Sequence, residues 1–186
     1  MKTIHYITAN KEKFRSASLI LKEFDIEVIQ ATIETPEVQA DSAVEVSRYS
    51  AEYGSKQLGT PVIKMDVEFI IEVFQSFPGP YIKYFNKNVP PEKVLKMVQG
   101  ETNRGAHFND VICFFNAKKM ISKCFEFRTN GTIGDKVVGK NGWGIDRVFI
   151  PDGYRQTLAE MSDEERLGVW KNNLWSDLAK YLLQTL

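Results

Sequence analysis

The chain begins with a short apolar run, Ile4–Ile7, which a polar loop and then a helical pattern follow directly. The run predicts a first strand, and the near-helical spacing of apolar residues over 14–24 predicts a helix directly after the loop. A loop at a helix N-terminus offers free backbone N–H groups and the positive end of the helix dipole, both of which suit a phosphate. Asn10 can cap this helix or hold a ligand oxygen, and Lys13 can bring a full positive charge to the same place. An ordinary N-cap beside a solvated lysine is the alternative explanation of this pattern.

The 186 residues are enough for one sizeable domain, and we expect a single domain over residues 1–186. Equal numbers of acidic and basic residues give a formal net charge of zero, which argues against a polybasic nucleic-acid binder or an acidic tail. No apolar run approaches the ~20 residues that span a bilayer, and the N-terminus lacks the basic and apolar layout of a signal peptide. We therefore expect a cytoplasmic protein that binds neither nucleic acid nor membranes.

The two cysteines, Cys113 and Cys124, fall in one strand-rich stretch. They form no CxxC pair and have no zinc-like spacing to a histidine, so we expect two reduced thiols in the core. The two histidines, His5 and His107, are too few and too far apart to predict a histidine-based metal site.

Helical and strand patterns alternate early in the chain, and strands gather in its middle. This order predicts a single α/β domain on a mixed sheet. Ser42 is the expected cap of the second helix, with Glu45 at the third position. The expected strands are Ile26–Ile29, Pro61–Asp66, Phe69–Phe74, Val111–Phe115, Met120–Phe125 and Thr132–Val138. The expected helices are Ser42–Leu58, Pro91–Gln99 and Ser162–Leu186. A hairpin turn is expected at Asn116–Lys119.

Two carboxylates and two lysines stand where a phosphate site could form. Asp66 ends an apolar strand, and ligand sites of α/β proteins form at the carboxyl ends of strands. Glu37 follows another strand, in a loop marked by proline, and could face the same edge. Two carboxylates with phosphate and water oxygens suit Mg²⁺, while Lys13 and Lys83 would oppose the charge of a polyphosphate. The alternatives are a turn acid for Asp66 and a solvated lysine for Lys83.

Longer strings follow one another in a fixed order along nearly the whole chain. They are T-x-N-x-x-K from Thr8, P-E-V-Q from Pro36, an apolar strand ending at Asp66, P-G-P-Y-I-K from Pro78, G-x-D from Gly144 and P-D-G-Y-R-Q-T-L-A-E-M from Pro151. In this order the chain resembles the inosine triphosphate pyrophosphatase family. The resemblance implies an elongated α/β fold with a long curved mixed sheet, two lobes, a central cleft, and a homodimer. It implies Mg²⁺-dependent cleavage between the α- and β-phosphates of a purine nucleoside triphosphate, which gives a monophosphate and pyrophosphate.

The resemblance also assigns roles to single residues. It implies that Asp66 holds the metal with Glu37 and activates water. It further implies a triphosphate site at Thr8, Asn10 and Lys13, a substrate contact at Lys83, and a border of the base at Trp143, Gly144 and Asp146.

The chain departs from the family pattern in both halves of the expected site. Met65 and Val67 stand where the family has a second acid and a hydroxyl residue. The second helix lacks the expected lysine, since Tyr49, Ser50 and Ala51 lie near that position and only Arg48 is basic nearby. Arg147 replaces the usual proline after Asp146. The S-H-R triplet of the last helix is absent, and an ungapped reading places Trp170, Lys171 and Asn172 there, with Arg166 where a lysine is usual.

These departures predict a changed preference for the base and a lower rate. A site built to bond a polar base edge discriminates strongly, so loss of the His-Arg pair removes the reason for inosine preference. Lys171 could still donate to an oxo group, and Asn172 could both donate and accept, as adenine would require. Core or interface packing is the alternative role for Trp143, Trp170 and Trp175.

Two functions remain open on the sequence. One is a Mg²⁺-dependent nucleoside triphosphate pyrophosphatase with altered base specificity. The other is a catalytically weak or inactive relative that serves as a nucleotide-binding or interaction protein. A nucleic-acid-binding module has little support, because no basic and aromatic stripe occurs.

Overall fold

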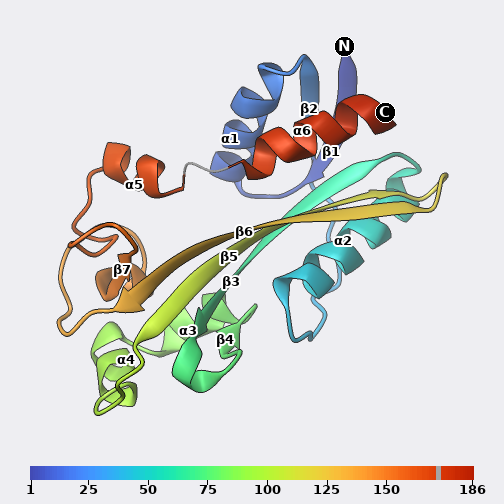
Figure 1. Ribbon diagram of the computed structural model, residues 1–186. Coiled ribbons are helices and arrows are strands. Elements are labelled where there is room, and N and C mark those ends of the chain that lie inside the picture. Colours follow the sequence, from blue (N-terminus) through green and yellow to red (C-terminus); the bar gives the residue numbers. More distant parts are fainter. Residues whose placement is uncertain (171–172) are drawn as a thin grey trace. The chain divides into compact units, whose positions relative to one another are not determined.

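The computed structural model describes residues 1–170 and 173–186, and the chain divides into two compact units (Figure 1). Unit 1 comprises Met1–Asp66, Asp110–Phe127 and Asn172–Leu186, and unit 2 comprises Val67–Asn109 and Arg128–Lys171. The strands are β1 (Lys2–Ile7), β2 (Ile26–Ala31), β3 (Val62–Ile71), β4 (Pro78–Gly79), β5 (Gly105–Asn116), β6 (Ile121–Ile133) and β7 (Phe149–Pro151). The α-helices are α1 (Lys11–Lys22), α2 (Ala43–Leu58), α3 (Ile82–Asn88), α4 (Pro91–Met97), α5 (Asp163–Val169) and α6 (Leu174–Thr185), and two 3-10 turns are η1 (Glu72–Phe74) and η2 (Gly144–Arg147).

The strands form one mixed sheet in the order β2-β1-β3-β5-β6-β7, with β4 paired to β3. β1 runs parallel to both β2 and β3, whereas β4 is antiparallel to β3 and β7 is antiparallel to β6. The predicted α/β class with a mixed sheet is therefore confirmed, while the predicted cleft stays a prediction. None of the helices in the described residues is long and apolar enough to cross a membrane.

Unit 1 carries helices on both faces of its strands. Neighbouring strand residues point to opposite faces, and each strand accordingly feeds two separate buried clusters. The α1 cluster joins α1 and α6 to the sheet through Ile4, Tyr6, Ala17, Leu21, Ile26, Ile63, Ile112, Phe114, Leu174, Leu178, Ala179 and Leu182. The α2 cluster joins α2 to the other face through Ile7, Ala31, Ala43, Ala51, Val62, Val111, Cys113 and Phe115.

The helix α2 begins and ends as its sequence predicts. The Ser42 hydroxyl accepts a hydrogen bond from the Glu45 backbone N–H at 3.3 Å, which satisfies one of the free donors of the first turn. The Glu45 carboxylate accepts from the Asp41 backbone N–H at 3.0 Å. The helix ends at Gly59, whose φ of 65° is a left-handed conformation that favours glycine.

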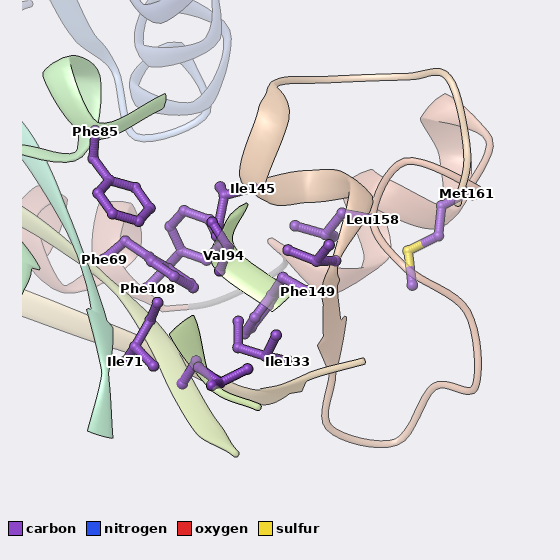
Figure 2. Packing of buried hydrophobic residues seen from close by; sticks show 13 residues of the cluster. Phe69, Ile71, Phe85, Val94, Phe108, Ile133, Ile145, Phe149, Leu158 and Met161 are labelled. Carbon is purple, nitrogen blue, oxygen red and sulfur yellow. The ribbon is translucent and has the colours of Figure 1, made fainter. Parts of the chain in front are cut away.

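Unit 2 has a core of its own, which is rich in aromatic side chains (Figure 2). Phe69, Phe108 and Phe149 contact one another, with ring centroids 4.5 to 5.5 Å apart. Trp170 packs its ring against Phe108 at 5.3 Å, so the alternative role of this tryptophan, core packing, is confirmed. In unit 1, Trp175 likewise packs against Tyr6 at 6.0 Å.

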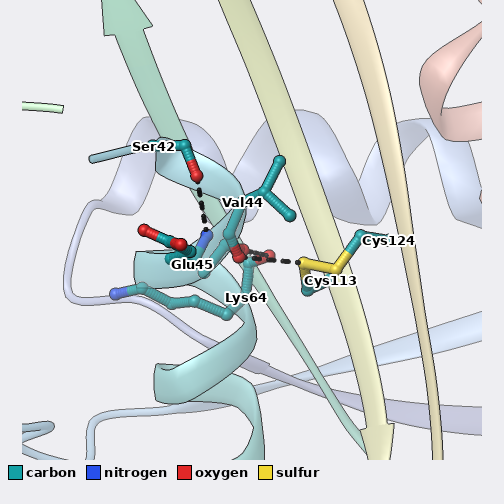
Figure 3. Close-up of a disulfide and its surroundings, with 7 residues drawn as sticks. Ser42, Val44, Glu45, Lys64, Cys113 and Cys124 are labelled. Atoms are coloured by element: carbon teal, nitrogen blue, oxygen red, sulfur yellow. Dashed lines mark hydrogen bonds between the residues drawn. A yellow bond between two sulfur atoms is a disulfide. The ribbon is translucent and has the colours of Figure 1, made fainter. Parts of the chain in front are cut away.

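Cys113 and Cys124 form a disulfide that joins β5 to β6 (Figure 3). The expectation of two reduced thiols is therefore wrong. The two Cα atoms are 4.1 Å apart, because the residues face each other across the hairpin that the Asn116–Lys119 turn closes. In Figure 3 the Cys113 sulfur lies beside the Val44 carbonyl oxygen of α2, at 3.8 Å. Only the pairing of the strands brings the two sulfurs together, and the spacing along the chain does not reveal that pairing.

The predicted elements differ from the observed ones mainly in extent. The expected strands Pro61–Asp66 and Phe69–Phe74 are one continuous strand, β3, which a 3-10 turn follows. The expected strand Thr132–Val138 is wrong as a separate element, since its first two residues end β6. The expected final helix is two helices, α5 and α6, and the short helix α3 was not predicted.

Candidate active site

The loop between β1 and α1 is built as a helix cap. The Asn10 side-chain oxygen accepts hydrogen bonds from the backbone N–H groups of Glu12 and Lys13, at 2.9 and 3.1 Å. The Asn10 N–H donates in turn to the Thr8 hydroxyl at 3.1 Å. The capping role of Asn10 is thus confirmed, and Thr8 is buried at the end of β1, where it supports the cap. Their contact with a triphosphate stays a prediction.

Lys13 is half-buried in the first turn of α1. Burial lowers the pKa of its ammonium, the nearby carboxylates of Asp66 and Asp110 oppose that lowering, and Lys64 adds to it. Lys13 is therefore not the solvated lysine of the alternative explanation. It is a cation that unit 1 holds close to two carboxylates.

Asp66 lies within β3, just beyond the end of β1. The parallel register pairs Tyr6 with Ile63, and β1 ends at Ile7, so Asp66 lies past the last residue of its neighbouring strand. One carboxylate oxygen, Oδ2, is buried and has no hydrogen-bond partner among the described residues. Burial raises the pKa of Asp66, while Lys64 and Lys13 lower it. The alternative of a turn acid is wrong, because β3 continues to Ile71.

Asp110 is an acidic residue of this site that the sequence analysis missed. It lies in β5 and is only 8% exposed, and its carboxylate forms no hydrogen bond or ion pair with another residue that the structure describes. Burial raises the pKa of Asp110 to about 6, with Lys13 acting in the opposite direction. The Tyr6 hydroxyl is also buried without a partner in the described chain, and its pKa is raised by burial and by Asp66 and Asp110. The signal that could have found Asp110 is a charge directly before the apolar run Val111–Phe115.

The predicted second metal ligand, Glu37, lies exposed in the segment between β2 and α2 of unit 1. Within the described residues, no group of three or more histidine, cysteine, aspartate or glutamate side chains could enclose a metal. This is compatible with Mg²⁺, which uses one or two protein carboxylates together with phosphate and water oxygens. The unpaired Asp66 oxygen is of the donor type that this hard cation takes. Pairing of Glu37 with Asp66 on one metal stays a prediction.

The positions that depart from the family pattern are occupied by packing residues. Met65 packs against the α1 cluster, on the face opposite to that of its neighbour Asp66. Ser50 and Ala51 are buried in α2, whereas Arg48 is exposed. Glu68 is buried and accepts a hydrogen bond from Asn109 at 2.9 Å, so it does not stand in for the missing acid.

In unit 2 the predicted base-binding loop is held by an ion pair. The Arg166 guanidinium lies 3.2 Å from the Asp146 carboxylate and also donates to the Leu158 carbonyl at 3.1 Å. The same carboxylate accepts from the Trp143 backbone N–H at 2.8 Å. Gly142 has a φ of +72°, and a Cβ there would lie 1.9 Å from the Asp146 carboxylate, so only glycine allows this close approach.

In this arrangement Trp143 is 60% exposed, next to the half-buried Gly144. Burial raises the pKa of Asp146, while its bonds to Trp143 and Arg166 lower it. Asp146 and Arg166 thus have a clear structural role, and their contact with a base stays a prediction.

The remaining predicted residues are not tied to these clusters. Lys83 is exposed on α3, with its ammonium 5.8 Å from the centroid of the Tyr84 ring. Lys171 and Asn172, predicted at the base edge, lie outside the described residues. The structure therefore brings Lys13, Asp66 and Asp110 together in unit 1, and brings Trp143, Asp146 and Arg166 together in unit 2.

Comparison with known proteins finds one family and its relatives along nearly the whole chain. Residues 4–169 match the sequence model of the Ham1 family. The dITP/XTP pyrophosphatase of Thermococcus kodakarensis is 35% identical over 161 residues, which cover 87% of this chain and 86% of the relative. The dITP/XTP pyrophosphatase of Methanopyrus kandleri is 36% identical over 162 residues, with 87% and 85% covered.

Solved structures share the fold. A HAM1 protein from Coxiella burnetii superimposes with a TM-score of 0.86 at 23% identity, over 99% of this chain and 100% of that chain. The Ham1 protein of Staphylococcus aureus does so with a TM-score of 0.84 at 25% identity, over 100% of both chains. By sequence and by fold, the chain belongs to the Ham1 family.

Proposed function

We propose that this protein hydrolyses nucleoside triphosphates between the α- and β-phosphates and releases a monophosphate and pyrophosphate. The observation that carries the proposal is that unit 1 holds the half-buried cation Lys13 within the electrostatic influence of an acid, Asp66, that has a buried carboxylate oxygen without a hydrogen-bond partner among the described residues. Two relatives that are 35 and 36% identical are named dITP/XTP pyrophosphatases, which supports a purine triphosphate as the substrate class.

The N-terminus of α1 would bind the phosphate chain. Its free backbone N–H groups and its dipole favour an anion, and Lys13 adds a full charge within the first turn. Thr8 and Asn10 hold the loop in the shape that presents these groups. Because the loop is preformed, little ordering is needed when a triphosphate binds.

Asp66 would act as the catalytic carboxylate. Its burial favours proton uptake, so it is suited to accept a proton from an attacking water. Glu37 and Asp66 would hold Mg²⁺, which when bound supplies charge neutralisation to a triphosphate. Lys83 would contact the substrate as a second cation.

Base recognition would differ from that of an inosine-specific site. The exposed ring of Trp143 offers a stacking face, and Gly144 and Asp146 would border the base beside it. Lys171 and Asn172 would supply donors and acceptors to the base edge. Arg166 would act through Asp146, since its guanidinium already bonds that carboxylate.

We further propose a homodimer that works in the cytoplasm. Light scattering of the purified protein tests whether it forms a dimer.

One assay separates this function from its alternative, a nucleotide-binding relative with little or no turnover. The alternative is favoured by Met65, whose packing in the α1 cluster leaves no second acid at this point of β3. The purified protein is incubated with Mg²⁺ and a panel of common and deaminated triphosphates, and pyrophosphate is measured. Release that Asp66→Asn abolishes supports the enzyme. Absence of release, with nucleotide binding still visible as a thermal shift, supports the alternative.

A further inference from the structure

The two halves of the η2 loop, residues 142–148, are held in unit 2 in different ways. Backbone N–H groups of other segments donate to the carbonyls of Asp146 and Arg147, at 2.9 and 3.0 Å. The first half, residues 142–145, has no such bond. In the described part of the chain, its single hydrogen bond to a residue outside the loop runs from the Ile145 N–H to the Asn86 side-chain oxygen, at 3.0 Å. The first half therefore depends on Asn86 for this attachment.

The Ile145 N–H needs this acceptor because it lies in the interior of unit 2. Ile145 is only 2% exposed, and Figure 2 shows it in the same core as Phe85, the neighbour of Asn86 on α3. The N–H groups of a first helical turn have no acceptor within their own helix. Without the Asn86 oxygen, either a buried donor stays unpaired or the loop moves away from α3.

Asn86 also lies against the neighbouring glycine of the loop. A Cβ added to Gly144 would lie 3.7 Å from the same Asn86 oxygen, which is an ordinary contact distance. On α3, Lys83 precedes Asn86 by three residues, a spacing that makes the two side chains neighbours on the helix surface. One helix thus carries the lysine that is expected to contact the substrate and holds the loop that is expected to border the base.

We propose that Asn86 is a positioning residue, whose side-chain oxygen holds Trp143 and Gly144 in the place where they receive the base. This rests on the proposed function for the identity of the ligand. A loop that is fixed before binding loses less conformational freedom when the ligand arrives, so the ligand binds more tightly. Asn86 acts through the loop, and its effect is therefore confined to the part of the ligand that the loop meets. Loss of Asn86 should weaken the binding of a nucleotide and spare the binding of a bare phosphate chain.

The first experiment observes the loop without any ligand, by amide hydrogen exchange in NMR spectra. Asn86→Leu keeps the size of the side chain but removes the acceptor, and we expect the Ile145 amide to exchange about tenfold faster or more. Asn86→Asp keeps an oxygen in the same place and should restore the protection. Asn88→Leu is the matched control, because the Asn88 side chain donates to the Tyr84 carbonyl within α3, at 2.8 Å. An unchanged exchange rate of Ile145 in Asn86→Leu would overturn the proposal.

The second experiment compares two ligands by calorimetry in the presence of Mg²⁺. They are inorganic triphosphate and a purine nucleoside triphosphate analogue that resists cleavage between the α- and β-phosphates. We expect Asn86→Leu to bind the nucleotide about tenfold more weakly and inorganic triphosphate nearly as well as before. Asn86→Asp and Asn88→Leu should keep the ratio of the two affinities. Equal weakening of both ligands in Asn86→Leu, or no weakening of the nucleotide, would contradict the positioning role.

Thermal unfolding checks that the variants fold. If Asn86→Leu does not fold, Asn86→Ala replaces it in both experiments, with the same expected results. If the unaltered protein binds neither ligand although the exchange of Ile145 responds as expected, the proposed function fails and the anchoring of the loop by Asn86 stands.

Discussion

In the proposed function, Lys13 is the side chain on which phosphate binding would most depend. It lies in the first turn of α1, close to Asp66 and Asp110, and we expect its charge to meet the outer phosphates of a bound triphosphate. We expect Lys13→Ala to weaken the binding of a nucleoside triphosphate by tenfold or more and that of the monophosphate much less. Calorimetry with both ligands measures the difference. Lys11→Ala is the control, since Lys11 is exposed in the same turn, and equal weakening of both ligands in Lys13→Ala would contradict the placement.

The raised pKa of Asp110 predicts that its carboxylate destabilises the folded protein at neutral pH. Its pKa of about 6 lies above the ordinary value of 3.8, so the folded state binds the proton more tightly than the unfolded state. Stability is therefore lost as the pH rises from 3.8 through 6, by roughly 3 kcal/mol in total. We expect the free energy of unfolding of Asp110→Asn to be higher than that of the unaltered protein at pH 8. At pH 4 we expect the two free energies of unfolding to be nearly equal.

Denaturant unfolding at the two pH values measures this difference. Asp25→Asn is the control, because Asp25 is exposed in the same unit and its φ of 57° is one that asparagine tolerates. A difference that does not change with pH would show that Asp110 is not a buried carboxylate of raised pKa.

The sequence predicted the residues whose roles are local. Asn10 and Ser42 were identified as caps because a cap depends on the few residues around it. Lys13 was identified from its place after β1, and Asp66 from an expected strand end that in fact lies inside β3. Asp110 was missed, because its neighbours on β1, β3 and α1 are far from it in the sequence and only the assembled sheet brings them together.

The disulfide between β5 and β6 is expected to contribute measurably to the free energy of unfolding. The disulfide closes a short loop, with 11 residues of sequence separation, and constrains the unfolded chain. A disulfide that closes a loop of this size stabilises the folded state by about 3 kcal/mol. We expect reduction to lower the free energy of unfolding by this amount, and Cys113→Ala with Cys124→Ala to do the same without responding to reductant. An equal response to reductant in the double variant would contradict this.

The attachment of α5 to the η2 loop depends on the ion pair of Arg166 with Asp146. The two side chains are 22 and 10% exposed, so removal of the cation leaves a largely buried carboxylate without its charge partner. We expect Arg166→Met to lower the free energy of unfolding by about 3 kcal/mol, and added Asp146→Asn to recover part of the loss. Lys180→Met is the control, because its pair with Asp177 is 67 and 52% exposed and contributes little.

Denaturant unfolding measures these variants. A loss in Arg166→Met no larger than that in Lys180→Met would show that the η2 loop does not depend on the ion pair.

The elements could be predicted in kind but not always in extent. β1, α1, β2 and α2 follow their local patterns within a few residues. β3 was divided in two, since Asp66 and Glu68 interrupt its apolar pattern although the structure accommodates both. α5 and α6 were joined, because the helical pattern of their apolar residues continues across both.

The order of the strands is a property of the chain as a whole. The order of helical and strand patterns predicted an α/β domain on a mixed sheet, but no local pattern states that β3 lies between β1 and β5. The resemblance of short strings in a fixed order predicted site residues in both units. Lys13, Asp66 and Glu37 lie in unit 1, whereas Lys83, Trp143 and Asp146 lie in unit 2. The proposed function requires Lys13, Asp66 and Glu37 of unit 1 to bind one molecule of substrate.

A structure of the protein with Mg²⁺ and a triphosphate analogue that resists cleavage between the α- and β-phosphates tests this requirement most directly. We expect the Lys13 ammonium within hydrogen-bond distance of the outer phosphates, with Glu37 and Asp66 both coordinating the magnesium ion at their side. An analogue bound with its phosphates away from Lys13, or Glu37 and Asp66 on opposite sides of the protein, would contradict the proposed active site.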